Sequence, residues 1–290
     1  MATAEHCLYC FDSLASKLDK NLTPLSLADV QDSYAAYLTH LKASPPPASS
    51  SSKKIPALTR LAGLADAASS SSSLASGQET TSSSSTTSLS TNTAATSTTS
   101  VTTPPPRERV SDPEARYPLF VTWDIKARGA EWHLRGCIGT FSAESPLSEC
   151  LAEYAVISAL HDSRFNPVSH AELANLKCSV TLLTNFEDCD AWDDWVVGEH
   201  GIKIRFKVKG RSYSGTYLPS VAAEQEWTKE ETMFSLMRKA GWRGSQDSWQ
   251  EVAGDSSSMQ VERYRGDKEE VEFAEYQQWR EWVNENWNKS

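Results

Sequence analysis

The sequence lacks any apolar run near the roughly 18 residues that a membrane-spanning helix needs, and no charged segment followed by an apolar core opens it. We therefore expect no membrane span and no export signal. Cysteine is also scarce, because six scattered residues in a chain of 290 are too few for a disulfide scaffold. Together these absences predict an intracellular protein with reduced thiols.

An excess of positive charge is missing too. The chain has 28 basic and 38 acidic residues, a net charge of −10, whereas a nucleic-acid-binding domain usually shows a basic stripe and a high isoelectric point. Nucleic acid is therefore not an expected partner. One basic row, Lys203, Arg205, Lys207 and Lys209, alternates with apolar residues. We interpret it as the solvated face of a half-buried strand, with a phosphate-binding track as the alternative.

The common chemical motifs are absent as well. The sequence has no phosphate loop, dinucleotide-binding fingerprint, His-Glu-x-x-His pair or nucleophile elbow. His6, Cys7 and Cys10 resemble half of a zinc site, but no second pair follows, and both cysteines fall on the apolar face of a helical pattern with Leu14. We expect them to pack in the core, and we expect no metal and no cofactor.

Composition divides the chain into three parts. Serine and threonine dominate from about Ser69 to Thr103, which predicts disorder, and proline triplets flank this stretch. The predicted linker covers 44–112, with a transient helix over 55–68, and separates N-terminal helices at 1–43 from a main body at 113–290.

Periodicity predicts the elements of both flanking parts. Helices are expected around Cys7–Leu18, from Ser26 with a capping box to Asp29, from Pro146 to about His161, at Thr228–Ala240 before Gly241, and from Ala274. Strands are expected at Leu119–Trp123, around Cys137, and at Lys177–Thr184, Ile202–Val208, Tyr213–Leu218, Gln260–Tyr264 and Val271–Phe273. Mixed helices and hairpins favour an α+β fold with antiparallel sheet.

The most informative segment runs from Leu134 to Phe141 and contains Leu134, Arg135, Gly136, Cys137, Ile138, Gly139 and Thr140. Two glycines in a strand mark a bulge or a close approach. In an extended chain Arg135, Cys137 and Gly139 share one face, so Gly139 should leave space beside the Cys137 thiol, with a guanidinium on the other side. This arrangement fits a ligand-binding site, a catalytic site or a tightly packed interface between domains.

Cys137 is the only plausible nucleophile, and a nearby guanidinium would lower the pKa of its thiol. A buried cysteine, however, is usually inert. His161 and His200 are candidate bases, although each also fits a structural position, and Asp162 with Arg164 beside His161 fits an ion pair at a helix end.

The Leu-Arg-Gly-Cys-Ile-Gly segment closely resembles the signature of the AMMECR-one domain family. Further matching segments, in the same order, are Tyr117–Trp123, Asp162–Phe165, Leu182–Asp188, His200–Ile202, Leu218–Ala222, Arg238–Gly241 and Tyr264–Arg265. Cys10-Phe11-Asp12 also resembles the first helix of the family.

This resemblance implies two subdomains with antiparallel sheets flanked by helices. A smaller subdomain is inserted in a larger one built from both chain ends, with the signature facing the cleft between them. The resemblance implies binding residues Leu134, Arg135, Gly136, Cys137, Ile138, Gly139, Thr140, Asp162 and Arg164, and location in the nucleus or cytoplasm. It implies no established reaction. We therefore expect a regulatory or adaptor protein that binds a protein or peptide in this cleft, and an enzyme or enzyme accessory subunit using Cys137 is the alternative.

Overall fold

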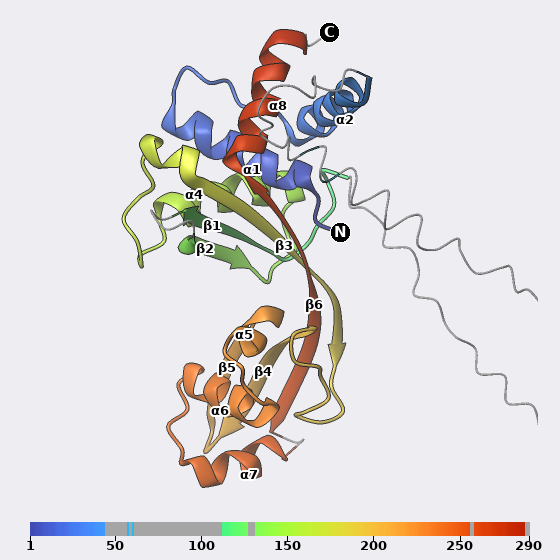
Figure 1. The fold of residues 1–290 in the computed structure, drawn as a ribbon. Coiled ribbons are helices and arrows are strands. Elements are labelled where there is room, and N and C mark those ends of the chain that lie inside the picture. Colours follow the sequence, from blue (N-terminus) through green and yellow to red (C-terminus); the bar gives the residue numbers. More distant parts are fainter. Residues whose placement is uncertain (44–56, 58–59, 61–111, 127–130, 256–257, 288–290) are drawn as a thin grey trace, which may run out of the picture. The chain divides into compact units, whose positions relative to one another are not determined.

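The computed structural model describes residues 1–43, 57, 60, 112–126, 131–255 and 258–287. Its larger elements in chain order are α1 Ala4–Leu18, α2 Leu27–Ala43, β1 Leu119–Lys126, β2 Trp132–Thr140, α4 Leu147–Leu160, β3 Leu176–Asp188, β4 His200–Val208, β5 Arg211–Tyr217, α6 Lys229–Lys239, β6 Met259–Glu272 and α8 Phe273–Asn286 (Figure 1). Short helices that the sequence did not predict are η1 His170–Asn175, α5 Pro219–Glu224, η2 Gln246–Ser248 and α7 Trp249–Ala253.

The strands form one six-stranded sheet in the order β2-β1-β3-β6-β4-β5, and every neighbouring pair is antiparallel. This confirms the α+β class with antiparallel pairing. The prediction of two separate strands after Gln260 is wrong, because β6 is continuous. Its charged middle resembles a loop in sequence, but there Glu270 pairs with Lys177 of the neighbouring β3 and with Lys268 of β6 itself.

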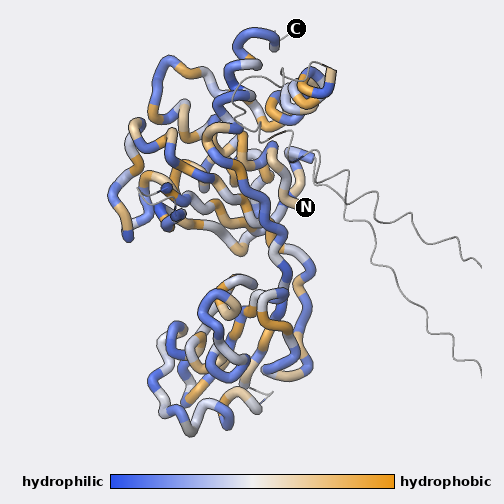
Figure 2. Tube along the Cα trace, viewed as in Figure 1, coloured by the Kyte–Doolittle hydropathy of each residue, from blue (hydrophilic) through white to orange (hydrophobic). Residues whose placement is uncertain are grey.

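The helices α1, α4 and α8 contact the half of the sheet that contains β1, β2 and β3. Leu119, Val121 and Trp123 alternate along β1 and are fully buried, and the Trp123 indole N–H donates to the Ala155 carbonyl of α4 at 3.0 Å. This period of two in burial is typical of a strand that buries one face. Apolar positions recur along the strands and along the helices (Figure 2).

The second N-terminal helix begins as the sequence predicts, whereas α1 begins at Ala4, before the expected Cys7. The Ser26 hydroxyl accepts from the Asp29 N–H at 3.1 Å, and the Asp29 carboxylate accepts from the Ser26 N–H at 3.1 Å, which is the expected capping box. Cys7 and Cys10 are fully buried, as expected for core residues, and the Cys7 thiol donates to the Glu269 carbonyl at 3.3 Å.

Helix α4 differs from its prediction at its start, and small residues form part of its buried face. Pro146 is the N-cap residue, one position before the helix, rather than its first residue. Tyr154 and Ile157 are only half-buried, whereas the smaller Cys150, Ala155 and Ala159 are buried. Small side chains let the helix axis approach its neighbours closely. The spacing of large apolar residues alone does not reveal a buried face that contains small residues.

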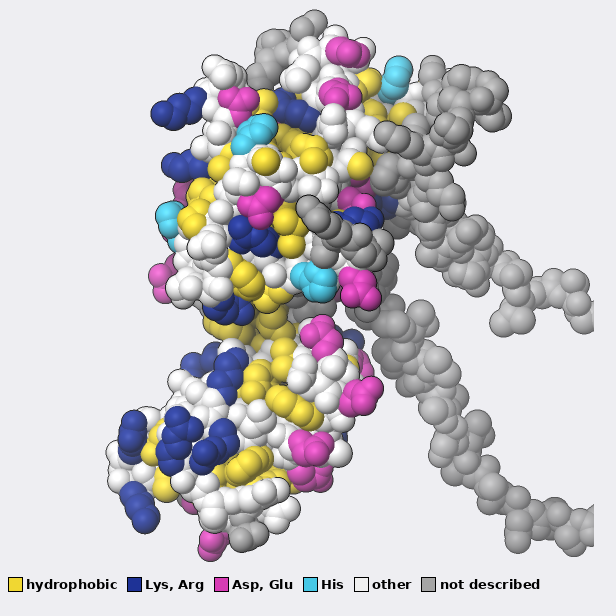
Figure 3. All heavy atoms as spheres, turned by 60° about the vertical axis from the view of Figure 1, so that its left-hand side comes forward, with side chains coloured by type: hydrophobic (Ala, Val, Ile, Leu, Met, Phe, Trp, Pro, Cys, Tyr) yellow, Lys and Arg dark blue, Asp and Glu magenta, His cyan; other side chains and the backbone are white. Residues whose placement is uncertain are grey.

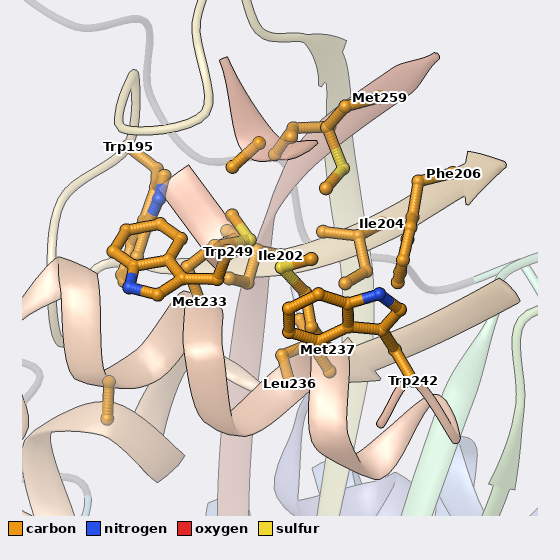
Figure 4. Close-up of a cluster of buried hydrophobic side chains, with 13 residues drawn as sticks. Trp195, Ile202, Ile204, Phe206, Met233, Leu236, Met237, Trp242, Trp249 and Met259 are labelled. Carbon is orange, nitrogen blue, oxygen red and sulfur yellow. The ribbon is translucent and has the colours of Figure 1, made fainter. Parts of the chain in front are cut away.

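A second apolar core lies around β4, where Ile202, Ile204 and Phe206 face helix α6 (Figure 4). Met233, Leu236 and Met237 of that helix meet them, and tryptophan rings close the cluster. Gly241 ends α6 with a φ of +97°, as the sequence predicts for a C-terminal glycine.

The predicted linker lies almost entirely outside the described residues. Of the described positions within it, Ala57 and Arg60 are helical, and Ala57 is buried. Within the described residues, no helix is both long enough and apolar enough to cross a bilayer.

Candidate functional site

Most of the signature segment lies in strand β2, which is at one edge of the sheet and, among the described residues, pairs with β1 alone. Gly136 is opposite Trp123, but Leu134 is opposite Asp124, so Arg135 is an extra residue that forms a bulge. A Cβ at Gly136 would overlap the Ser158 carbonyl oxygen of α4. The predicted bulge and close approach are therefore both present, at Arg135 and Gly136 respectively.

Arg135 does not lie beside the Cys137 thiol as predicted from simple alternation. Its guanidinium pairs with Glu172 at 2.9 Å and donates to the Asn166 carbonyl at 2.7 Å. The bulge re-aims the side chain, because one extra residue breaks the period of two. Arg135 therefore ties the signature strand to the segment that leads into η1.

Glu172 also accepts from the Ser169 N–H at 2.8 Å and the Ser169 hydroxyl at 2.9 Å, which caps η1. The Arg135 guanidinium and Ser169 hold the pKa of the Glu172 carboxyl below its usual range, although burial opposes them. The Ser169-x-x-Glu172 spacing is a capping-box pattern, so the sequence contained a signal for this turn that we missed.

Asp162 and Arg164 occupy the outer edge of β2 at Cys137. The Cys137 N–H donates to the Asp162 carboxylate at 2.9 Å, and the Arg164 guanidinium donates to the Cys137 carbonyl at 3.0 Å. The two side chains also pair with each other at 2.7 Å. We call this arrangement the edge clamp. It satisfies the backbone groups that a neighbouring strand would otherwise bind.

The edge clamp strongly lowers the pKa of the Asp162 carboxyl. The hydrogen bonds from Arg164 and from the Cys137 N–H hold the pKa of Asp162 far below its ordinary value, and burial opposes this only in part. Asp162 is therefore an anion at every physiological pH, fixed between a guanidinium and a strand.

The Cys137 thiol is half-buried and accepts a hydrogen bond from the Thr122 hydroxyl at 3.1 Å. Burial raises the pKa of Cys137, although the Thr122 hydroxyl and the Arg164 guanidinium act in the opposite direction. The predicted lowering of this pKa is therefore wrong, because desolvation of the thiolate outweighs a guanidinium that is itself exposed to solvent. A resting thiol at this position is a weak nucleophile.

The space expected beside Gly139 is filled. A Cβ at Gly139 would overlap the Leu119 carbonyl oxygen and the Phe120 ring. The glycine thus serves packing against β1 rather than access to the thiol, which corrects the sequence-based expectation.

Neither candidate base reaches the thiol. His161 is the exposed C-cap residue of α4, with its N–H bonded to the Ile157 carbonyl at 2.8 Å. His200 begins β4, at the far side of the sheet order from β2, and its Nδ1 accepts from the Val196 N–H at 3.0 Å. Burial lowers the pKa of His200. Within the described residues no group of three or more side chains is arranged to hold a metal ion.

The side chains around the thiol form the face of β2, β1 and β3 opposite the buried side of β1. Register places Thr122 opposite Cys137 and Ser179, and Asp124 opposite Leu134 and Lys177. We call this set of six residues the signature face. Leu134 is 41% exposed, one of only two large apolar side chains so exposed in the described residues. Sequence reasoning missed Thr122, Asp124 and Lys177, because only the strand register brings them beside the signature.

Charges on the signature face are partly compensated. Lys177 lies 3.9 Å from Asp124 and 3.2 Å from Glu270, and its ammonium also lies over the Trp132 ring at 5.1 Å. Burial raises the pKa of Asp124 above its usual range, although Lys177 opposes the shift. The face therefore presents the carboxylate of Asp124, the Thr122 hydroxyl, the half-buried Cys137 thiol and the exposed Leu134, whereas Ser179 is buried.

An aromatic chain leads from the signature to β6. The Phe120 ring meets Phe141 at 5.6 Å, Phe141 meets Tyr264 at 5.6 Å, and Tyr264 stacks on Phe186 at 5.1 Å. Tyr264 is fully buried and its hydroxyl donates to the Tyr217 carbonyl at 3.0 Å. The end of the signature is thus joined by packing to the part of the sheet where β6 meets β4.

Comparison with protein-family models gives one family match, and the similar curated proteins are uncharacterised. The family model described as AMMECR1 matches residues 74–268. An uncharacterised protein of Schizosaccharomyces pombe is 48% identical over 144 residues, which are 50% of this chain and 74% of that protein. An uncharacterised protein of Arabidopsis thaliana is 48% identical over 133 residues, 45% of this chain and 62% of that protein.

Among solved structures, the crystal structure of the uncharacterised protein PH0010 from Pyrococcus horikoshii matches with a TM-score of 0.46 and 28% identity, covering 57% of this chain and 79% of that one. The extent of the family match, together with the signature in β2, assigns the chain. It belongs to the AMMECR1 family.

Proposed function

We propose that this protein is a regulatory or adaptor protein, acting inside the cell in the nucleus or cytoplasm, that binds a protein or peptide on the signature face. The observation that supports this most is the exposure of Leu134 beside a fixed, half-buried polar set. A signature that served only the core would be buried throughout, whereas Cys137, Ile138 and Thr140 are only half-buried.

The edge clamp argues against one binding mode, in which a partner adds a strand to the sheet edge at Cys137. Addition of a peptide strand to a sheet needs free N–H and C=O groups along the edge. At Cys137 both groups are already bonded to Asp162 and Arg164. The partner therefore contacts the side chains of the signature face, with an apolar residue against Leu134 and hydrogen-bonding groups near Asp124 and Thr122.

The enzymatic alternative has less support. A cysteine nucleophile needs a lowered pKa or a neighbouring base, but burial raises the pKa of Cys137 and no contact joins its sulfur to His161 or His200. The two hydrogen bonds at Cys137 that the clamp makes go to its backbone rather than its sulfur.

A matched pair of substitutions tests the binding proposal. Leu134→Glu places a charge on the signature face, and Val196→Glu introduces the same charge at an apolar side chain that is 50% exposed in the loop between β3 and β4. Each protein is used to isolate bound partners from cell extract, and the partners are quantified by mass spectrometry. We expect the wild type and Val196→Glu to bind the same partners and Leu134→Glu to lose them. All three proteins should have the same melting temperature. Equal retention by both variants would contradict binding through this face.

A further inference from the structure

The basic row of β4 contains two cations without an anionic partner in the described part of the chain. Lys203, the first of the row, pairs with Glu262 of β6 at 2.9 Å. Arg205 and Lys207 are exposed, and within the described residues neither forms an ion pair. In a chain with a net charge of −10, two neighbouring unpaired cations on a strand flanked by β6 and β5 are a specific feature rather than general surface charge.

Register surrounds these cations with hydrogen-bonding side chains. Arg205 is opposite Ser214 of β5 on one side and Gln260 of β6 on the other. Lys207 is opposite Ser212, and its N–H donates to the Ser258 carbonyl at 3.1 Å. Alternate residues of a strand lie about 6.6 Å apart and cross-strand neighbours about 5 Å apart. Two cations are therefore flanked by the hydroxyls of Ser212 and Ser214 and the Gln260 amide within the dimensions of one small ligand, while the Ser258 hydroxyl donates to the Asp255 carbonyl at 3.3 Å.

This area is hollowed. An open cavity of about 460 Å³ is lined by Arg205, Phe206, Lys207, Ser212, Tyr213, Ser214, Ser258 and Gln260. We call it the β4 bowl. Its volume is in the range of small-molecule sites, which span roughly 300–1,000 Å³. Lys and Arg side chains also gather on the part of the surface that contains β4, β5 and α6 (Figure 3).

The lining distinguishes a small molecule from a protein partner. Protein interfaces depend on large apolar side chains at their centre, and the two exposed ones in the described residues, Leu134 and Val196, do not line the bowl. The opposite face of β4 is packed in the core through the buried Ile202 and Ile204, which holds the strand that carries both cations in place.

We propose that the β4 bowl binds a small molecule that carries a phosphate group. A guanidinium binds phosphate oxygens in a fork, a lysine ammonium adds a point charge, and hydroxyl and amide N–H groups complete the shell of donors. This site is distinct from the signature face, which contains the carboxylate of Asp124.

Calorimetric titration of the full chain with inorganic pyrophosphate and with ribose 5-phosphate tests the proposal. We expect saturable binding of both, weakened at least about tenfold, or 1.4 kcal/mol, in Arg205→Gln/Lys207→Gln. Arg211→Gln is the matched control, since Arg211 is in the same hairpin but is opposite Val208 and does not line the bowl. We expect that variant to bind as the wild type does.

A second variant, Ser212→Ala/Ser214→Ala, keeps every charge and removes two donors. We expect the dissociation constant of this variant to rise about threefold or more, because each serine removed takes away a hydrogen bond to the charged phosphate. Melting temperatures equal to wild type show that each variant is folded. No saturable heat, an equal loss in Arg211→Gln, or unchanged affinity without the serines would overturn the proposal. Much tighter binding of a single-stranded oligonucleotide or a phosphopeptide would overturn it in favour of a macromolecular partner.

Discussion

Asp162 shows how one side chain can stabilise an exposed strand edge. It accepts from the Cys137 N–H, from the Arg164 N–H and from the Arg164 guanidinium. Asp162→Asn keeps an acceptor for Cys137 but loses the charge that binds Arg164. Because Arg164 is exposed, we expect a loss of only about 2 kcal/mol at pH 7, in the range of hydrogen bonds to charged groups.

The pH dependence of that loss has a defined sign. The pKa of Asp162 is depressed in the folded protein, whereas an unfolded aspartate titrates near about 3.9. The carboxylate therefore stabilises the fold fully above that pKa, and less as the pH falls towards the folded value. Urea unfolding at pH 7, 5 and 3 should give a difference between wild type and Asp162→Asn that shrinks at pH 3. A constant difference would mean that charge is not involved.

The Cys137 thiol is expected to behave as a protonated, unactivated group. Burial raises its pKa, and Arg164 is the nearby cation that opposes this. Peptide mapping after iodoacetamide treatment should show labelling of Cys137 that rises steeply above pH 8.5 and is slower in Arg164→Gln. Arg135→Ala should leave the rate unchanged, since Arg135 pairs with Glu172. Selective labelling at pH 6.5 would instead favour the enzymatic alternative.

At the scale of elements, Gly136 sets the distance between β2 and α4. A Cβ there would overlap a backbone carbonyl of α4, which cannot rotate away. We expect Gly136→Ala to lower the free energy of unfolding by about 3 kcal/mol, as overpacking does. Gly210→Ala is the control, because it has open space and only a φ of +77°, for which we expect about 1 kcal/mol. Similar values in denaturant unfolding would contradict the close-approach argument.

The sequence predicted most elements because their signals are local. The period of two in β1, the Ser26–Asp29 capping box and Gly241 after α6 each depend on residues within a few positions. The signature was recognised in the same way, and the bulge that its glycines suggested is present. The surroundings of Cys137 were not predictable for two reasons. The bulge at Arg135 directs the Arg135 side chain away from the thiol, and the strand register, which the sequence does not show, brings Thr122 to the thiol.

At the scale of the whole molecule, the core of the signature-bearing half is made by both chain ends. Asp12 of α1 is fully buried, pairs with Arg280 of α8 at 3.0 Å and accepts from Tyr276 at 3.1 Å. Tyr34 of α2 donates to Glu275 at 2.7 Å. These helices lie outside residues 74–268, which the family model matches. The family match therefore does not delimit a folding unit.

Two experiments test this dependence. A fragment of residues 110–290 loses α1 and α2, exposes the apolar face of the sheet and leaves Arg280 without Asp12. Burial of apolar area on this scale contributes several kcal/mol, comparable with the whole stability of a domain. We expect the fragment to be insoluble or to give poorly dispersed amide NMR signals. In the second experiment the full chain is cut once within the Ser/Thr-rich segment at 69–103, and the two pieces should elute together as a single complex in gel filtration. A sharp, dispersed spectrum from the fragment, or separation of the two pieces after cleavage, would show that the N-terminal helices are not part of this core.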